Sequence, residues 1–132
     1  MAGLADLRLA HRNLDRLLGR FLAAAEASAS APALEAIVAF DEELRRHTAL
    51  EEDEWLPRAA GHGLAPAEVE TPEARLGREL RLEHVQIREV SGLMRRLAES
   101  GDLEQARRLF GNLARRWDAH TEKEERAFPG PA

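Results

Sequence analysis

The sequence predicts an all-α protein with an up-down-up-down antiparallel four-helix bundle, and three observations predict it. Ala, Glu, Lys, Leu and Arg supply 81 of the 132 residues, whereas valine and isoleucine supply six, too few for a sheet protein. Proline, glycine and serine divide the chain into four long segments. Each segment carries apolar residues at steps of three and four, which is the spacing of one buried helical face. We therefore expect a single domain over residues 1–132.

The first two segments form the first expected helical hairpin. A helix over Leu4–Ala27 ends at the break Ser28–Pro32, and a second helix over Ala33–Leu56 follows. Proline stops the second helix, because proline lacks the N–H that a helix interior requires. The segment Pro57–Glu70, which contains two glycines and a further proline, is a longer linker.

The last two segments begin with recognisable capping residues. The third helix is expected over Thr71–Glu99, with Thr71 as the N-cap and Pro72 at the first helical position, where proline is favoured. The fourth begins at Asp102, and Gln105 three residues later completes a capping-box pattern. It ends near Phe128, because a Pro-Gly-Pro sequence follows.

Composition excludes several classes of function. The sequence has no cysteine, which excludes thiolate metal sites and a cysteine nucleophile. The net charge of −5 comes from interspersed signs, so no basic face indicates nucleic acid. No run reaches the roughly 18–20 apolar residues of a membrane span, and the first residues lack the pattern of a signal peptide. We therefore expect a cytoplasmic protein with neither a nucleic-acid nor a membrane partner.

Every apolar stripe contains a histidine where an apolar residue is expected, and two stripes continue into a glutamate. The six residues are His11, His47, Glu51, His84, His120 and Glu124. Polar side chains on buried faces are costly unless they find partners. These six are therefore the candidate functional residues.

An internal repeat relates the two halves of this set. A shift of 73 residues maps His11 onto His84, and it maps the sequence HTALEE, which begins at His47, onto HTEKEE, which begins at His120. Two hairpins related by a pseudo-two-fold axis would place two metal ions in nearly equivalent surroundings. At 1.5 Å per residue, the four histidines also fall at similar depth along an up-down bundle.

The chemistry of the six residues favours a pair of divalent metal ions. Burying Glu51 and Glu124 as bare carboxylates would cost several kcal/mol each. The His-x-x-x-Glu spacing places each glutamate on the same helical face as a histidine. Each glutamate can then bridge two metals that each take two imidazoles, and imidazole suits Fe, Zn, Cu and Ni.

The order of these residues resembles the hemerythrin-like (HHE cation-binding) domain family. The similarity covers essentially the whole chain, and it includes the sequences EEDEWLP and EERAFP after the two His-x-x-x-Glu motifs and the Glu83-His84 pair. The resemblance implies a bundle that holds two iron ions as a non-haem di-iron centre. It also implies a small diatomic ligand such as O2 or NO, or peroxide, because the family includes oxygen carriers, sensors and proteins that repair iron centres.

One position departs from the oxygen carriers of that family. They place a further histidine one turn before the ligand of the third helix, where this sequence has Leu80. Four histidines and two glutamates look more like the iron-centre repair proteins, although these usually carry a cysteine-containing N-terminal segment that the sequence lacks. Reaction with NO, peroxide or oxygen is therefore expected rather than reversible oxygen carriage.

Two other classes of function stay open. One is a non-catalytic metal-binding module for iron, zinc or manganese, with a storage or structural role. The other is a plain helical interaction bundle, against which the buried histidines and glutamates argue.

Residues beside the candidate ligands receive simpler interpretations. Glu83 is expected to point off the core face, at the surface or in support of a ligand, and Glu52 and Glu125 are expected to face outward. His62 is expected in a solvated loop. A dry wall beside the metals is expected from four core residues: Phe40, Leu44, Leu113 and Trp117.

Overall fold

The computed structural model describes residues 3–55 and 71–127, and these ranges are almost entirely helical. The elements are α1 (Leu4–Glu26), α2 (Ser30–Leu50), the π-helix η1 (Glu51–Trp55), α4 (Pro72–Glu99) and α5 (Leu103–Ala127). The described ranges contain no strand, so the prediction of an all-α protein is confirmed. No helix in them is both long enough and apolar enough to cross a membrane. The expected linker, His62 and the expected end at Phe128 lie outside the described residues.

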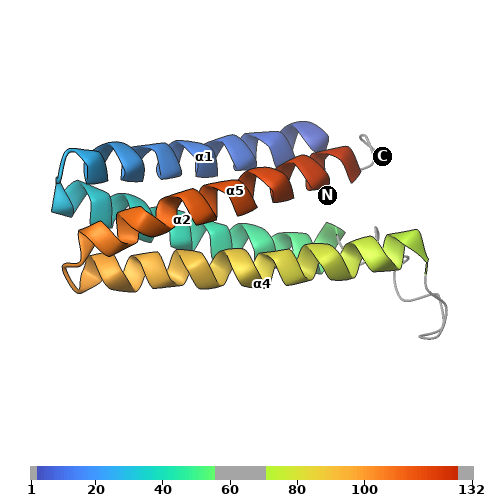
Figure 1. The fold of residues 1–132 in the computed structure, drawn as a ribbon. Coiled ribbons are helices and arrows are strands. Elements are labelled where there is room, and N and C mark those ends of the chain that lie inside the picture. The colour runs from blue at the N-terminus through green and yellow to red at the C-terminus, as the bar shows by residue number, and fades with distance from the viewer. Residues whose placement is uncertain (1–2, 56–70, 128–132) are drawn as a thin grey trace.

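The four long helices lie lengthwise beside one another (Figure 1). The colour gradient reverses its direction from each long helix to the next, and the start of α1 lies at the same end as the end of α5 (Figure 1). Helix α1 packs against α2 and α5, and α4 packs against the same two helices. All four helices therefore contribute one face to a shared interior.

The predicted starts of α4 and α5 agree with the structure. The Thr71 hydroxyl accepts a hydrogen bond of 3.0 Å from the Ala74 N–H, and the Asp102 carboxylate accepts one of 3.2 Å from the Gln105 N–H. Between these helices Gly101 has a φ of 89°, a conformation that favours glycine. Local capping chemistry thus defines both helix starts.

The second helix differs from its prediction at both ends. It begins at Ser30 rather than Ala33, because Pro32 lies in the first helical turn, where no backbone donor is needed. The expected continuous helix to Leu56 instead changes to the π-helix η1 at Glu51. Short π-helical turns occur frequently at functional sites.

The interior consists of two apolar clusters with a polar layer between them. On α1, Leu7 belongs to the small cluster and Leu14 to the large one, and the buried His11 lies between them in the sequence. On α4 the buried His84 lies in the same way between Leu80 and Ile87. The fold thus places the histidines in a layer that apolar side chains bound on both sides.

Candidate metal centre

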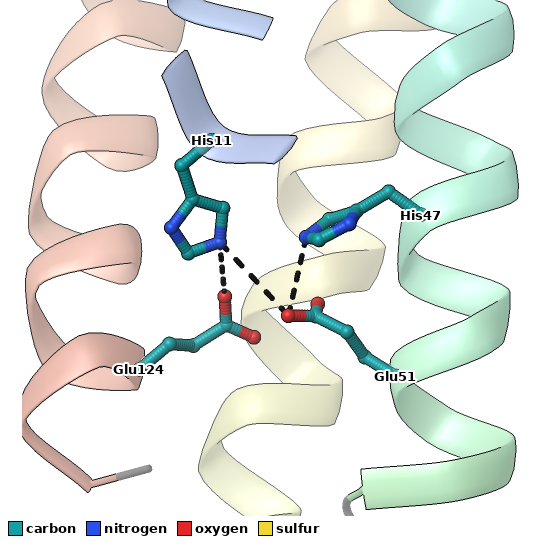
Figure 2. Close-up of side chains that lie close together, drawn as sticks. All are labelled: His11, His47, Glu51 and Glu124. Atoms are coloured by element: carbon teal, nitrogen blue, oxygen red, sulfur yellow. Dashed lines mark hydrogen bonds and ion pairs between the residues drawn. The ribbon is translucent and has the colours of Figure 1, made fainter. Parts of the chain in front are cut away.

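The structure brings all six predicted residues together in two overlapping groups. One group consists of His11, His47, Glu51 and Glu124, and the other consists of Glu51, His84, His120 and Glu124. Within each group the donor atoms all lie within 4.8 Å of one another. Figure 2 shows the first group, with two imidazoles pointing toward two carboxylates. The two glutamates belong to both groups, as the bridging interpretation requires.

Each long helix supplies one of the four histidines. His11 comes from α1 and His84 from α4, while His47 and His120 come from α2 and α5. The two glutamates follow their histidines by four residues, which places each pair on one helical face. All six side chains are buried, because these faces form the interior of the bundle.

In the first group, both imidazoles approach Glu51. The Nε2 atom of His47 lies 3.2 Å from Glu51 Oε2, and the Nε2 atom of His11 lies 3.9 Å from the same oxygen. The His11 Nε2 atom also lies 3.0 Å from Glu124 Oε1. This pair of histidines therefore faces one oxygen of each glutamate (Figure 2).

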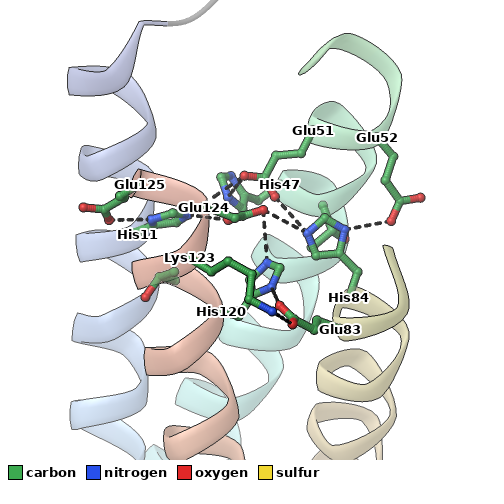
Figure 3. A network of polar contacts seen from close by, with 12 residues as sticks. His11, His47, Glu51, Glu52, Glu83, His84, His120, Lys123, Glu124 and Glu125 are labelled. Atoms are coloured by element: carbon green, nitrogen blue, oxygen red, sulfur yellow. Dashed lines mark hydrogen bonds and ion pairs between the residues drawn. The ribbon is translucent and has the colours of Figure 1, made fainter. Parts of the chain in front are cut away.

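In the second group, the imidazoles face the other oxygen of each glutamate. The Nε2 atom of His84 lies 3.1 Å from Glu51 Oε1 and 3.1 Å from Glu124 Oε2. The Nε2 atom of His120 lies 3.1 Å from the same Glu124 oxygen. Each carboxylate thus presents one oxygen to each histidine pair (Figure 3).

The spacing of these atoms fits metal coordination. With bonds of about 2.1 Å, two ligands at right angles lie about 3.0 Å apart and two opposite ligands about 4.2 Å apart. Among the described residues, four buried atoms make no hydrogen bond: His47 Nε2, His120 Nε2 and both carboxylate oxygens of Glu51. Leaving such atoms without partners costs about 1–3 kcal/mol each. Divalent cations between the carboxylates would give all four atoms partners.

Two glutamates hold the outer ring nitrogens of two of the histidines. His11 Nδ1 lies 2.8 Å from a carboxylate oxygen of Glu125, and His84 Nδ1 lies 2.8 Å from one of Glu52 (Figure 3). The expectation that Glu52 and Glu125 face outward is therefore wrong. A side chain one residue from the core face is turned by about 100°, which points it at the neighbouring helix of a bundle. The 73-residue repeat of this glutamate pair was the signal that could have revealed it.

A third glutamate holds the outer nitrogen of His120. His120 Nδ1 lies 2.7 Å from a carboxylate oxygen of Glu83, and Glu83 also forms an ion pair with Lys123. Of the two expected roles for Glu83, the structure shows the supporting one. Carboxylates on the outer nitrogen fix the orientation of a metal-binding imidazole and increase its basicity.

The buried carboxylates control the protonation of the histidines in the metal-free protein. Burial lowers the pKa of His84, but its contacts with Glu124 and Glu51 outweigh burial and raise the pKa to about 10. Burial also lowers the pKa values of His11 and His120, but Glu124 and Glu125 raise that of His11 and Glu124 and Glu83 raise that of His120, with a net increase in both. Burial raises the pKa of Glu124, but three histidines hold it well below its usual value. Protons therefore balance the buried negative charge when no metal is bound.

Aromatic and aliphatic side chains form the expected wall beside the centre. The Trp117 ring lies edge-on to His11, with a centroid distance of 5.5 Å, and packs against Phe40 at 6.0 Å. The Trp117 Nε1–H donates a hydrogen bond of 2.6 Å to Asp15. The four residues of the predicted wall are all buried: Phe40, Leu44, Leu113 and Trp117.

Leu80 lies on the opposite side of the polar layer from this wall. It is fully buried and belongs to the small cluster with Leu7. It precedes His84 by one helical turn, so both side chains lie on the same face of α4.

Comparison with known proteins gives no match among family models, curated proteins or solved structures. The function of this chain must therefore be inferred from the chemistry of the site.

Proposed function

We propose that this chain is an up-down-up-down bundle of the hemerythrin type that binds two iron ions as a non-haem di-iron centre. We propose further that the centre binds or reacts with a small diatomic molecule, O2 or NO, or with peroxide. One observation carries the proposal: each of two buried glutamates presents one oxygen to each of two histidine pairs. Bridging carboxylates with histidines from facing helices are an established way to build such a centre in a bundle.

The ligand assignment follows from the two groups of donor atoms. His11 and His47 would bind one ion, His84 and His120 would bind the other, and the two glutamates would bridge the ions. Each ion would then have four protein donors, fewer than the six of octahedral coordination. When bound, the iron pair supplies electrons and exchangeable coordination positions for a small ligand.

The surrounding residues support reaction rather than reversible oxygen carriage. Leu80 occupies the position at which oxygen carriers of the resembling family have a histidine, and its fully buried side chain supplies no donor atom. Trp117 and its neighbours exclude water from one side of the layer, which strengthens electrostatic interactions inside it. Outer carboxylates keep three of the four imidazoles, those of His11, His84 and His120, oriented whether or not a ligand is present.

A non-catalytic metal site for zinc or manganese is the second candidate. The site contains only nitrogen and oxygen donors, which also suit these metals. Near-complete burial of all six residues is also typical of a closed structural site. This candidate differs from the first in predicting no spectral response to oxygen or NO.

Anaerobic reconstitution with ferrous iron tests the proposal. We expect two irons per chain by elemental analysis and an optical spectrum that changes on addition of NO or oxygen. His47→Ala should lower the iron content, whereas His62→Ala, which alters the one histidine outside the repeat, should keep two irons. A ceiling of one metal per chain would contradict the dinuclear centre, and a spectrum unchanged by both gases would favour the second candidate.

A further inference from the structure

The internal repeat allows the surroundings of the two histidine pairs to be compared position by position. It equates His11 with His84, and the structure surrounds these two alike. Each has a glutamate 2.8 Å from its outer nitrogen. Each of these glutamates also contacts an arginine, Arg8 at 3.2 Å and Arg88 at 3.4 Å. The surroundings of His11 and His84 therefore favour neither metal position.

The repeat also equates His47 with His120, and here the surroundings differ. Glu83 lies 2.7 Å from the outer nitrogen of His120, but the position equivalent to Glu83 is Ala10. Among the described residues, no carboxylate contacts the outer nitrogen of His47. The difference extends outward, because Lys123, which pairs with Glu83, is replaced at its equivalent position by a leucine.

The two glutamates also differ from each other, although each belongs to both groups of donor atoms. Glu124 accepts hydrogen bonds from His11 and His84 and is completely buried. Glu51 is 6% exposed, and neither of its oxygens has a hydrogen bond among the described residues. Glu51 also opens the π-helix η1, whereas Glu124 lies within the regular helix α5. His47 is the most exposed of the four histidines at 7%, against 1% for His120.

We infer that the two metal positions are unequal, with a cation occupying His84 and His120 first and His11 and His47 second. The physical reason is the carboxylate of Glu83, which orients the His120 ring and increases its basicity, while no carboxylate of the described residues supports the outer nitrogen of His47. Loss of an outer-nitrogen partner typically lowers metal affinity by about 10–100-fold. We therefore expect the two dissociation constants to differ by about that factor, so that a one-metal form accumulates at one equivalent. This inference rests on the proposed dinuclear site and concerns its order of filling.

Zinc titration of the metal-free protein tests the order without any assay of activity. Zinc is diamagnetic, so the ring nitrogens of ¹⁵N-histidine-labelled protein can be followed by NMR at each step. With the first equivalent we expect the His84 and His120 signals to move to their metal-bound positions. The His11 and His47 signals should reach theirs only with the second equivalent. His62, outside the repeat, serves as the internal reference.

Matched variants at the supporting glutamates separate this cause from a general loss of structure. Glu83→Gln removes the charge beside His120, so it should weaken the first binding step about tenfold and bring the two steps together. Glu125→Gln makes the same change beside His11, so it should weaken the second step and widen the gap. Ala10→Glu places a carboxylate at the position equivalent to Glu83 and should strengthen the second step. General destabilisation would weaken both steps in every variant.

Three results would overturn the inference. In the first, the His11 and His47 signals move before those of His84 and His120. In the second, all four histidine signals move in proportion up to two equivalents. In the third, Glu83→Gln changes neither the order of filling nor the difference between the two dissociation constants. Failure of the proposed dinuclear site would give a different result. Zinc would then leave all four histidine signals unmoved, or binding would saturate at one equivalent.

Discussion

Metal binding by this protein should release protons over an unusually wide pH range. In the metal-free form the buried carboxylates of Glu124 and Glu51 raise the pKa of His84 to about 10. Its Nε2 atom must lose the proton before it can bind a cation. An ordinary histidine, with a pKa near 6.5, would release almost no proton above pH 8.

The size of the effect follows from the pKa. At pH 8 a group with a pKa near 10 is protonated in all but about 1% of molecules, and removing its proton costs about 2.7 kcal/mol. The apparent dissociation constant for the metal should therefore fall about tenfold for each pH unit between 7 and 9, for the proton of His84 alone. His11 and His120, whose pKa values are also raised, can only add to this dependence.

Calorimetric titration with zinc at pH 8 in two buffers of different ionisation enthalpy measures the released protons directly. We expect at least one proton per chain, and chelator competition at pH 7, 8 and 9 should show the dissociation constant falling. A dissociation constant that changes less than threefold from pH 7 to pH 9, with no proton released, would refute the reasoning. In that case the buried carboxylates would not be balanced by protonated histidines.

Four further predictions concern stability and ligand chemistry. The pKa of His84 is higher in the folded than in the unfolded chain, so its contribution to stability is complete below about pH 6.5 and is lost as the pH rises toward 10. The melting temperature of the metal-free protein should therefore fall between these pH values. A melting temperature that does not change with pH would contradict the raised pKa. Trp117→Ala should lower the free energy of unfolding, measured in urea, by about 3–5 kcal/mol, because it leaves a cavity at a buried site. Trp117→Phe keeps an aromatic ring but loses part of the ring volume and the hydrogen bond to Asp15, which contributes about 1 kcal/mol, so it should destabilise the protein less than Trp117→Ala. Oxygen should oxidise the reduced iron-loaded protein irreversibly, so that removing oxygen does not restore its optical spectrum. Full restoration of the spectrum would show that leucine at position 80 does not prevent reversible oxygen binding. Leu80→His buries a polar ring at a cost of about 1–3 kcal/mol in the metal-free protein, and iron should recover part of this if the new imidazole binds it.

Much of the fold could be predicted because its determinants are local. Thr71 caps α4 and Asp102 caps α5 through contacts within one helical turn. The predicted start of α2 at Ala33 is three residues late, because Pro32 lies within the first helical turn rather than in the break between the helices. The spacing of apolar residues does not indicate the change to a π-helix at Glu51.

The candidate site was predictable in its inner layer and not in its outer one. The six inner residues are polar side chains on apolar faces, and helical periodicity alone reveals such an anomaly. Glu125 lies beside a candidate ligand in the sequence, but the imidazole that it contacts is on another helix, 114 residues away. Local geometry turns Glu125 away from its own core face and cannot show what the neighbouring helix presents to it.

The sequence by itself determined which residues occupy the buried faces and that the two hairpins repeat one pattern, because both properties depend on spacing along the chain. Only the tertiary structure decided how the repeat is broken. Glu83 contacts the outer nitrogen of His120, whereas the equivalent position is Ala10 and no carboxylate of the described residues contacts the outer nitrogen of His47. This difference depends on contacts between helices. The packing of α4 against α5 also placed Glu83 on the ring of His120, because a contact between helices depends on their relative position and not on the periodicity of either one.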